Sequence, residues 1–412
     1  MPEIAVIGAG AAGLMAAIHA AGPGRRVRLY ESTADGGRKI LISGGGRCNV
    51  LPSVLEPRDY VTASSPNTMR NILRSWPLAE QQQFFEEEVG LPLVLEPETG
   101  KLFPVANKAR AVRDSLLHLA ERRGVEFVPE TRLVDLMPDA GRWKLIFAQA
   151  AARTADAVIL ATGGLSVPQT GSDGAGLSLL ARLGHTVHPT YPALTPLTLE
   201  PAHYTDLAGI SLTVTITATS ATEKRIATGG FLFTHRGFSG PAALDVSHVA
   251  VRGRLAGDAP ARLSVHWGTR TQAQWEFSLA PGAQSVANAV RQWLPARLAD
   301  RLLAHADVPG ATVLAQLTRG ARLKVLDAVL RYPLPWTSDE GYKKAEVTGG
   351  GVALAEVQPR TLESRILPGL FLAGELLDAF GPIGGYNFVW AWTTGRLAGL
   401  GATQHEVTVP GL

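Results

Sequence analysis

Residues 4–13, IAVIGAGAAG, decide the fold of this chain. Four residues that favour β-strands lead into Gly8, Gly10 and Gly13, and an apolar, helix-favouring stretch follows at residues 14–21. This spacing predicts the strand, tight turn and helix start of a dinucleotide-binding βαβ unit. Gly8 allows the turn, Gly10 lets the backbone approach a pyrophosphate, and Gly13 lets the helix pack on the strand. The helix N-terminus would add N–H donors and a positive dipole end for phosphate charge.

A second predicted strand, VRLYE at residues 27–31, ends in Glu31, 18 residues after Gly13. An acidic residue at about this spacing is typical of the side chain that binds a ribose hydroxyl group. Because a carboxylate there disfavours a 2′-phosphate, NAD or FAD fits better than NADP. The alternative is an ordinary βα turn with an exposed Glu at a strand end.

Composition limits the function classes. The chain has 412 residues, 46% hydrophobic and 18% charged, which predicts two or three domains of an ordinary soluble enzyme. The formal charge of +3 is small, and no run of Lys and Arg is interleaved with aromatics, so we expect no nucleic-acid partner. With no basic leader and no apolar stretch of about 18 residues, we expect a cytoplasmic protein without a membrane partner. The oligomeric state stays open.

The chain has one cysteine, Cys48. A single cysteine excludes a disulfide within the chain, a CxxC metal site and the redox-active cysteine pair of thiol–disulfide flavin reductases. Two alternatives remain for the thiol: a buried, inert side chain, or a reactive one. We predict no metal site.

The order of patterns predicts an α/β protein whose dinucleotide-binding Rossmann domain is interrupted by a β-rich insert. We expect the first domain at residues 1–190 and 345–412, the β-rich substrate domain at 191–283 and 332–344, and a helical subdomain at 284–331. Within the first domain, the patterns predict a loop at 36–49, helices at 67–76, 79–90 and 109–124, a hairpin at 91–104, strands at 124–138, 141–148 and 156–164, and a final helix at 387–401.

Three further motifs point to the same ligand. In RKILISGGGRCN (38–49), three glycines beside Arg38, Lys39 and Arg47 offer backbone and positive charge to a pyrophosphate or an anionic flavin. VILATGG (158–164) is a buried strand that ends where ligands bind in open α/β sheets.

The third motif covers residues 369–392, where an apolar strand enters Gly374-Glu375 and Gly384-Gly385 opens the final helix. The N–H donors and the positive dipole end of that helix would stabilise negative charge on a reduced flavin.

These motifs resemble one known family. The chain carries, in order, GGRKILISGGGRCN (36–49), ILATGGLS (159–166), FLFTHRGFSGPAAL (231–244), EVTGGGVAL (346–354), RTLESRILPGLFLAGELLD (360–378) and GGYN (384–387). The set is similar to that of bacterial FAD-dependent flavoproteins, the "NAD(P)/FAD-dependent oxidoreductases" typified by aminoacetone oxidase and 3-oxo bile-acid reductase. The resemblance, from residue 4 to about 400, implies a glutathione-reductase-like FAD fold with a β-rich substrate domain. Val50-Leu51, Ala175 and Leu177 depart from the family pattern, which puts transfer of the known substrates in doubt.

The resemblance implies FAD contacts along the whole site. The pyrophosphate would lie at the first glycine turn, the adenosine ribose at Glu31, and adenine at the backbone of Leu133. The expected cofactor residues are Gly8, Gly10, Ala11, Ala12, Gly13, Glu31, Arg38, Lys39, Ser43, Gly45, Arg47, Cys48, Asn49, Leu133, Ala161, Thr162, Gly163, Gly374, Glu375, Asp378, Gly385, Tyr386, Asn387 and Phe388.

For catalysis, His235 and Tyr386 are the candidate side chains, as an acid–base group and a substrate-orienting hydroxyl. We expect an FAD-dependent oxidoreductase of a small organic substrate, and lean slightly towards an oxidase. An NAD(P)H-dependent reductase of an unsaturated or oxo substrate is the main alternative. A non-catalytic FAD sensor or a tRNA-modifying flavoprotein is a further one. No second GxGxxG follows a strand, so any NAD(P)H would be a transient donor without a domain of its own.

Overall fold

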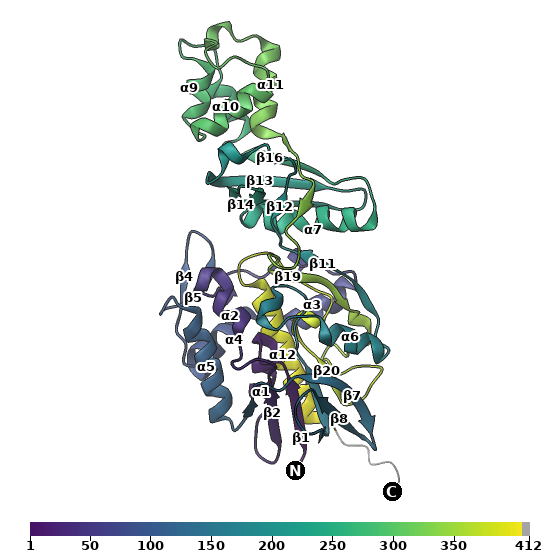
Figure 1. The fold of residues 1–412 in the computed structure, drawn as a ribbon. Coiled ribbons are helices and arrows are strands. Elements are labelled where there is room, and N and C mark those ends of the chain that lie inside the picture. Colours follow the sequence, from purple (N-terminus) through teal and green to yellow (C-terminus); the bar gives the residue numbers. More distant parts are fainter. Residues whose placement is uncertain (406–412) are drawn as a thin grey trace. The chain divides into compact units, whose positions relative to one another are not determined.

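A computed structural model describes residues 1–405 of the chain. It divides into two compact units (Figure 1): unit 1 comprises residues 1–191 and the chain from 347 onward, and unit 2 comprises Pro192–Glu346. The chain leaves unit 1 along β11 (Val187–Ala193) and returns along β19 (Val347–Val352), and these two strands pair with each other.

A five-stranded parallel sheet forms the centre of unit 1, in the order β20-β10-β1-β2-β6. The strands are β1 (Glu3–Ile7), β2 (Arg26–Tyr30), β6 (Glu126–Val128), β10 (Ala157–Leu160) and β20 (Leu370–Leu372). Strand β10 is buried along its whole length, as expected for a parallel strand covered on both faces. The predicted α/β Rossmann architecture is confirmed, with the βαβ unit at its centre.

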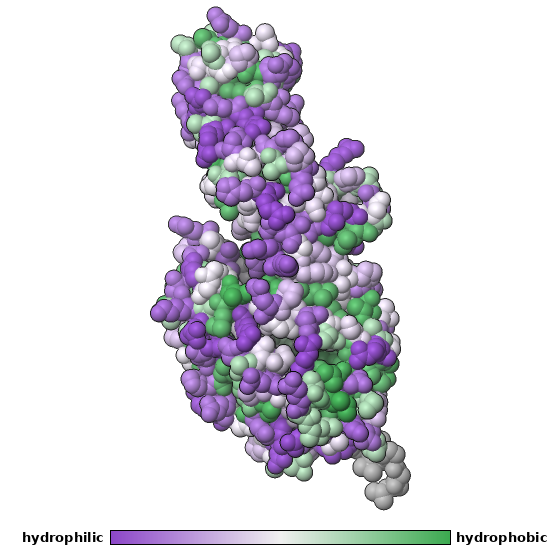
Figure 2. Space-filling model, in the orientation of Figure 1, coloured by the Kyte–Doolittle hydropathy of each residue, from purple (hydrophilic) through white to green (hydrophobic). Residues whose placement is uncertain are grey.

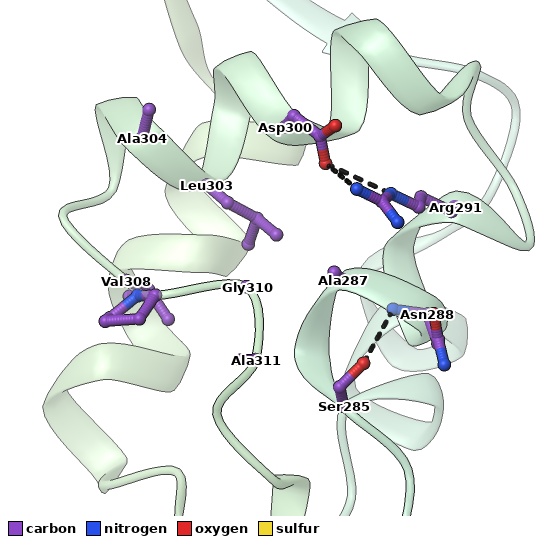
Figure 3. Close-up of a pocket in the computed structure, with 11 residues that line it drawn as sticks. Ser285, Ala287, Asn288, Arg291, Asp300, Leu303, Ala304, Val308, Gly310 and Ala311 are labelled. Atoms are coloured by element: carbon purple, nitrogen blue, oxygen red, sulfur yellow. Dashed lines mark hydrogen bonds and ion pairs between the residues drawn. The ribbon is translucent and has the colours of Figure 1, made fainter.

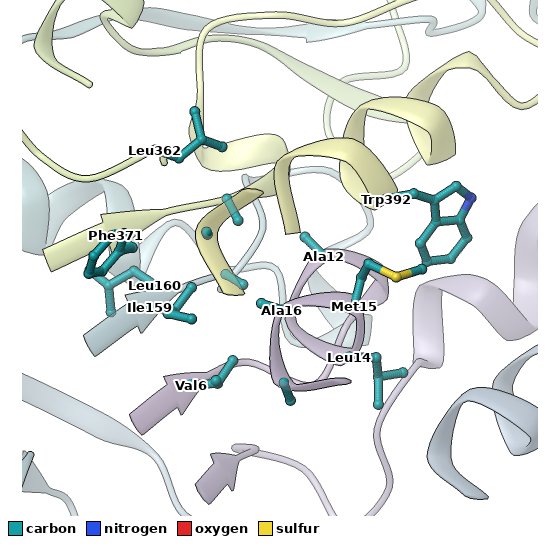
Figure 4. Close-up of a cluster of buried hydrophobic side chains, with 14 of the residues drawn as sticks. Val6, Ala12, Leu14, Met15, Ala16, Ile159, Leu160, Leu362, Phe371 and Trp392 are labelled. Atoms are coloured by element: carbon teal, nitrogen blue, oxygen red, sulfur yellow. The ribbon is translucent and has the colours of Figure 1, made fainter. Parts of the chain in front are cut away.

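Two helices pack closely against each other beside this sheet, α1 (Ala11–Ala20) and α12 (Tyr386–Gln404). The close approach depends on small residues: a Cβ atom on Gly395 would lie 2.3 Å from the Ala12 carbonyl oxygen, and one on Gly399 would lie 2.4 Å from that of Ala16. Figure 4 shows Ala12, Met15 and Ala16 of α1 in the buried cluster of unit 1. The final helix therefore fixes α1, whose N-terminus opens the cofactor motif.

The remaining elements of unit 1 surround this centre. An antiparallel sheet contains β7 (Leu133–Asp139), β8 (Arg142–Phe147) and β9 (Arg153–Ala155). A second contains β3 (Leu51–Pro52), β4 (Leu93–Glu96) and β5 (Lys101–Pro104), which confirms the predicted hairpin. The helices are α3 (Pro66–Arg74), α4 (Leu78–Gln83), α5 (Ala109–Arg122) and α6 (Ala175–Arg182).

One local prediction is wrong. Residues 36–49 were expected to form a loop, but Arg38–Ile42 form a short helix, α2. The helix starts after Gly37, whose φ of 72° reverses the chain, and it buries Ile40 in the core of unit 1. The apolar side chains of RKILI thus favour a helical turn, and only the glycines after it form the exposed turn.

Unit 2 is a seven-stranded antiparallel sheet with helices, in the strand order β17-β16-β13-β14-β15-β12-β18. Its strands are β12 (Leu197–Thr198), β13 (Ser211–Thr219), β14 (Lys224–Phe233), β15 (Gly237–Ser239), β16 (Arg262–Trp267), β17 (Tyr332–Leu334) and β18 (Ser338–Asp339). Its helices are α7 (Pro241–Ala256), α8 (Gln272–Ser278), α9 (Val286–Arg291), α10 (Ala296–His305) and α11 (Arg319–Leu330).

The helical segment at 284–331 shares one hydrophobic cluster with this sheet. The cluster runs from Phe231 and Trp267 of the strands to Leu298 and Val325 of the helices, so sheet and helices form one compact unit. Helix α7 was not predicted, because it is buried around most of its circumference and shows no clear apolar stripe. Among the described residues, no helix has both the length and the apolar character needed to cross a membrane.

Candidate cofactor-binding site

The first glycine turn has the geometry that a dinucleotide needs. Gly8 has a φ of 98°, and a Cβ atom there would lie 2.6 Å from the Ala161 carbonyl oxygen. A Cβ atom on Gly13 would lie 1.7 Å from the carbonyl oxygen of Gly8, so the helix packs on the turn without any side chain between them. At Gly10, in contrast, a Cβ atom would meet no protein atom within 4 Å. Gly10 precedes helix α1 and has no side-chain cap, so this open space fits a pyrophosphate.

Glu31 lies at the end of β2 and is buried, with 8% exposed. Its Oε2 accepts a hydrogen bond from Ala9 N at 2.8 Å, and its Oε1 accepts bonds from the N and Oγ1 of Thr33, both at 2.8 Å. The Glu31 carbonyl oxygen accepts a bond from Thr131 N at 2.7 Å, which holds the chain before Leu133 beside it. The carboxylate is thus fixed next to the glycine turn. Its bond to ribose, and that of the Leu133 backbone to adenine, stay predictions.

An ion pair joins four of the motifs. Lys39 Nζ lies 2.7 Å from Glu375 Oε2, and it also bonds to Ser166 Oγ. Glu375 Oε1 accepts bonds from Ser166 Oγ at 2.6 Å and Thr348 N at 2.8 Å. Burial favours the neutral form of Glu375, but the charge of Lys39 and these hydrogen bonds outweigh it and lower the pKa of the carboxyl group below its usual value. The sequence did not single out Ser166 or Thr348, and their places inside ILATGGLS and EVTGGGVAL were the only signal.

Two buried polar atoms near the predicted site have no protein partner. They are Asn49 Oδ1, after the triple-glycine turn, and Thr162 Oγ1, after β10. Gly44, Gly45 and Gly46 all have positive φ, and a Cβ atom on Gly45 would meet nothing within 4 Å. Both atoms have almost no exposed surface, and Thr162 Oγ1 packs against α6, where a Cβ atom on Gly176 would lie 2.0 Å from it. Neither atom therefore faces open space, and their contact with FAD stays a prediction.

Cys48 is fully buried and has a φ of 62°. Burial raises the pKa of its thiol to about 12, against a smaller opposing effect of Ser43. A neutral thiol is a poor nucleophile, which favours the inert alternative over the reactive one.

The two predicted arginines bond to protein groups. Arg38 Nε lies 2.8 Å from Asp35 Oδ1. Arg47 donates to Asn107 Oδ1 at 2.7 Å and to Glu96 Oε1 at 2.9 Å, and its guanidinium lies 3.9 Å from the centre of the Phe103 ring. Their contact with FAD stays a prediction.

Backbone contacts and hydrogen bonds hold the start of α12 in place. Gly385, with a φ of 100°, precedes the helix, and a Cβ atom there would lie 2.9 Å from Leu51 C. The hydroxyl group of Tyr60 donates to the Tyr386 carbonyl oxygen at 2.7 Å, and Asn387 exchanges two 2.9 Å bonds with the backbone of Gly381. These contacts fix the helix N-terminus that was predicted to face a reduced flavin.

The other predicted residues of this region also have structural contacts. The Phe388 ring stacks on that of Trp392, with centroids 5.1 Å apart. Asp378 is buried, and its Oδ2 accepts bonds from Ser64 N and Oγ, both at 2.8 Å, which holds residues 62–64 in place.

The structure places all predicted cofactor residues in unit 1, from Gly8 of the first turn to Phe388 of α12. His235 lies in unit 2, exposed in the bend between β14 and β15. Its neighbour Arg236 lies 3.8 Å from Glu200 and 4.0 Å from Glu340. A catalytic role of His235 or Tyr386 stays a prediction.

A pocket of about 580 Å³ lies elsewhere, among the helices of unit 2 (Figure 3). Its charged side chains pair with each other: Arg291 Nη2 lies 2.6 Å from Asp300 Oδ1. It contains none of the predicted site residues. In the part of the chain that the structure describes, no group of His, Cys, Asp or Glu could hold a metal ion.

Comparisons with known proteins identify the family of this chain. Residues 2–401 match the model of the HI0933-like protein Rossmann domain family. The chain is 33% identical to the ribosomal RNA dihydrouridine synthase of Escherichia coli over 94% of its length and 95% of that protein. It is 30% identical to the 3-dehydro-bile acid delta(4,6)-reductase of Clostridium scindens over 98% of its length and 100% of that protein.

A similar solved structure is the 3-ketosteroid delta1-dehydrogenase of Sterolibacterium denitrificans. It has a TM-score of 0.53 and 12% identity, and the match covers 98% of this chain and all of that one, which supports the fold alone. The chain belongs to the HI0933-like family of Rossmann-fold flavoproteins, and it is an FAD-dependent oxidoreductase.

Proposed function

We propose that this member of the HI0933-like family reduces a carbon–carbon double bond conjugated to a carbonyl group, with NAD(P)H as the electron donor. Two relatives that match nearly the whole chain support this reaction class. Dihydrouridine is uridine whose ring double bond is saturated beside a carbonyl, and a delta(4,6)-reductase of a 3-dehydro-bile acid acts on double bonds in line with a ketone. Although the substrates differ, the bond that is reduced is of the same kind.

The residues of unit 1 have distinct tasks in this proposal. FAD, when bound, supplies hydride transfer between a nicotinamide and the substrate. The open face of Gly10 receives the pyrophosphate, and Glu31 receives the ribose. The N-terminus of α12 would stabilise negative charge on the reduced flavin. The open space beside Gly10, in a turn whose Gly8 and Gly13 pack tightly against backbone, is the observation that carries the proposal of a functional FAD site.

A reductase of this class also needs a proton donor for the second carbon of the double bond. Tyr386 and His235 are the candidates in this chain. The Tyr386→Phe and His235→Gln variants should separate reduction of the flavin from reduction of the substrate. NAD(P)H should still reduce the flavin in both variants, whereas product formation should fall in the variant that lacks the proton donor.

The names of the relatives support the reductase alternative over the oxidase that the sequence slightly favoured. Stopped-flow mixing of anaerobic protein with NADH and NADPH tests the choice. We expect flavin bleaching at 450 nm with one of them, followed by reoxidation on addition of a 3-keto-4-ene steroid or a uridine-containing RNA. Bleaching by a small amine or alcohol that is much faster than by either nicotinamide would refute the reductase proposal and favour the oxidase.

A second candidate is narrower: the double bond belongs to a uracil base in RNA. Two relatives carry the name ribosomal RNA dihydrouridine synthase, those of Escherichia coli and Haemophilus influenzae, and the latter is 29% identical over 98% of this chain. A uracil in RNA would require a surface that binds the polynucleotide. The formal charge of +3 over the whole chain does not by itself predict such a surface.

A further inference from the structure

We infer that unit 2 carries an RNA-binding surface around helix α8, formed by Arg270, Phe277, Trp293, Arg319 and Arg322. We call it the α8 surface. The inference deepens the proposed function, since it rests on reduction of a conjugated double bond and adds that this bond lies in an RNA base.

Charge is distributed unevenly along the chain. Residues 284–331 contain seven Lys and Arg but three Asp and no Glu, which gives a formal charge of +4. The whole chain has +3, so everything outside this segment has a formal charge of −1. Four of these seven cations pair with Asp side chains, namely Arg291, Arg301, Lys324 and Arg331. Arg319 and Arg322 belong to the α8 surface together with Arg270, which precedes the segment, so the cations of the surface are separated in sequence and form no basic run.

Hydrogen bonds attach two members of the α8 surface, Arg270 and Arg322, to α8 and to the residue after it. Arg270 Nη2 donates to Gln274 O and Ser278 Oγ, both at 2.9 Å, which attaches this arginine along α8. Arg322 Nε donates to Leu279 O at 3.0 Å, which attaches α11 just beyond the end of α8. Arg319 lies one helical turn before Arg322 on α11 and is exposed. Glu276 is the carboxylate of α8, and it accepts a bond from Gln272 of the same helix at 2.8 Å.

Aromatic side chains lie among these cations. The guanidinium of Arg270 lies 3.6 Å from the centre of the Trp293 ring, and Trp293 is 50% exposed. Phe277 of α8 is 83% exposed. The face of the protein drawn in Figure 2 carries both hydrophilic and hydrophobic side chains. Unpaired bases stack on exposed aromatic rings and on guanidinium planes, while cations bind the phosphates. The combination matches single-stranded or loop RNA.

Other occupants fit these residues less well. A second copy of the chain, paired about a two-fold axis, would bring this cationic face against itself, which like-charge repulsion opposes. An anionic lipid surface would satisfy the charge, but α8 exposes a single large apolar side chain, Phe277, where a membrane-binding helix exposes a whole apolar face. RNA satisfies both the charge and the stacking.

The test measures binding of a fluorescein-labelled, uridine-containing RNA hairpin to the FAD-loaded protein by fluorescence anisotropy, over a series of KCl concentrations. We expect Phe277→Ala to weaken binding by about tenfold. We expect Arg319→Gln to weaken it and to lower the slope of log K against log salt by about 0.7–1. Matched controls are Ile226→Ala, which removes a 57% exposed apolar side chain from β14, and Arg74→Gln, which removes an exposed cation from α3. Both should stay within about twofold of the wild type.

Four results would overturn the inference. The first three are absence of RNA binding by the wild type, equal binding by the α8 variants and the controls, and a dimer in light scattering that Phe277→Ala dissociates while RNA binding persists. The fourth is loss of binding to phosphatidylglycerol vesicles by the α8 variants with unchanged RNA binding, which would assign the surface to lipid. Anisotropy needs no turnover, so failure of the reductase proposal would appear separately, as missing reoxidation by any unsaturated substrate. Flavin content and thermal melting of each variant check that it is folded.

Discussion

Gly10 and Gly13 lie three residues apart in one motif, yet the structure predicts opposite consequences for a methyl group at each. The backbone of Gly10 is extended, with a φ of −75°, and its added Cβ atom meets no protein atom within 4 Å. The added Cβ atom of Gly13 would lie 1.7 Å from Gly8 O and 2.9 Å from Gly8 C. We therefore expect Gly10→Ala to remove FAD from a folded protein, and Gly13→Ala to damage the fold itself.

The magnitudes follow from these distances. A separation of 1.7 Å is about half of a normal contact between heavy atoms, and both partners belong to the backbone, so α1 must move away from the sheet. Overpacking of this kind costs about 3 kcal/mol or more, a large share of the roughly 5–15 kcal/mol that stabilises a typical protein. Gly10→Ala should change the stability of the apoprotein by less than about 0.5 kcal/mol, since it meets only open space.

The assay combines the ratio of flavin absorbance to protein with urea unfolding of the FAD-free proteins. Gly22→Ala is the matched control, because an added Cβ atom there meets only a flexible Arg25 nitrogen at 3.8 Å. It should keep both flavin and stability. If Gly10→Ala retained FAD with wild-type affinity, the pyrophosphate would not lie over Gly10, and the assignment of the site to this turn would be wrong.

Three further predictions concern buried ionisable groups. The thiol pKa of Cys48 is raised to about 12, so Cys48 should not react with iodoacetamide at pH 8 until the protein unfolds. Cys48→Ser should keep FAD and most activity. Loss of turnover with flavin still bound would show that the thiol is functional. Burial lowers the pKa of His19 from 6.5 to about 4. The free energy of unfolding should therefore be highest above pH 6.5 and fall by up to about 3 kcal/mol as the pH drops towards 4. In urea unfolding, His19→Phe should reduce this dependence on pH. Lys39→Met leaves the Glu375 carboxylate without its cation and should cost about 1–3 kcal/mol at pH 7. That deficit should shrink below the normal Glu pKa of about 4.3, where protonation removes the charge, and an equal deficit at both pH values would contradict the ion-pair argument.

The sequence alone determined the central fold, because the glycine turn depends on local backbone geometry. Gly8 needs a positive φ and Gly13 needs the absence of a side chain, and both requirements can be read from residue type and spacing. The parallel strands and the hairpin at 91–104 were also predictable, since the spacing of apolar residues within each segment already indicates a strand. The helix α7 was missed because distant segments bury it around most of its circumference, and the short helix at Arg38–Ile42 was missed because the glycines around it favoured a loop.

Tertiary structure decided which side chains meet. No pattern in the sequence pairs Lys39 with Glu375, and none indicates that Asn49 and Thr162 keep unpartnered polar atoms. Such contacts depend on side-chain positions that come together from segments far apart in the chain. The α8 surface shows the same limit, since its cations are dispersed along the sequence and gather only when the helices pack. Local geometry therefore fixed the cofactor fold, and long-range packing fixed the contacts that surround it.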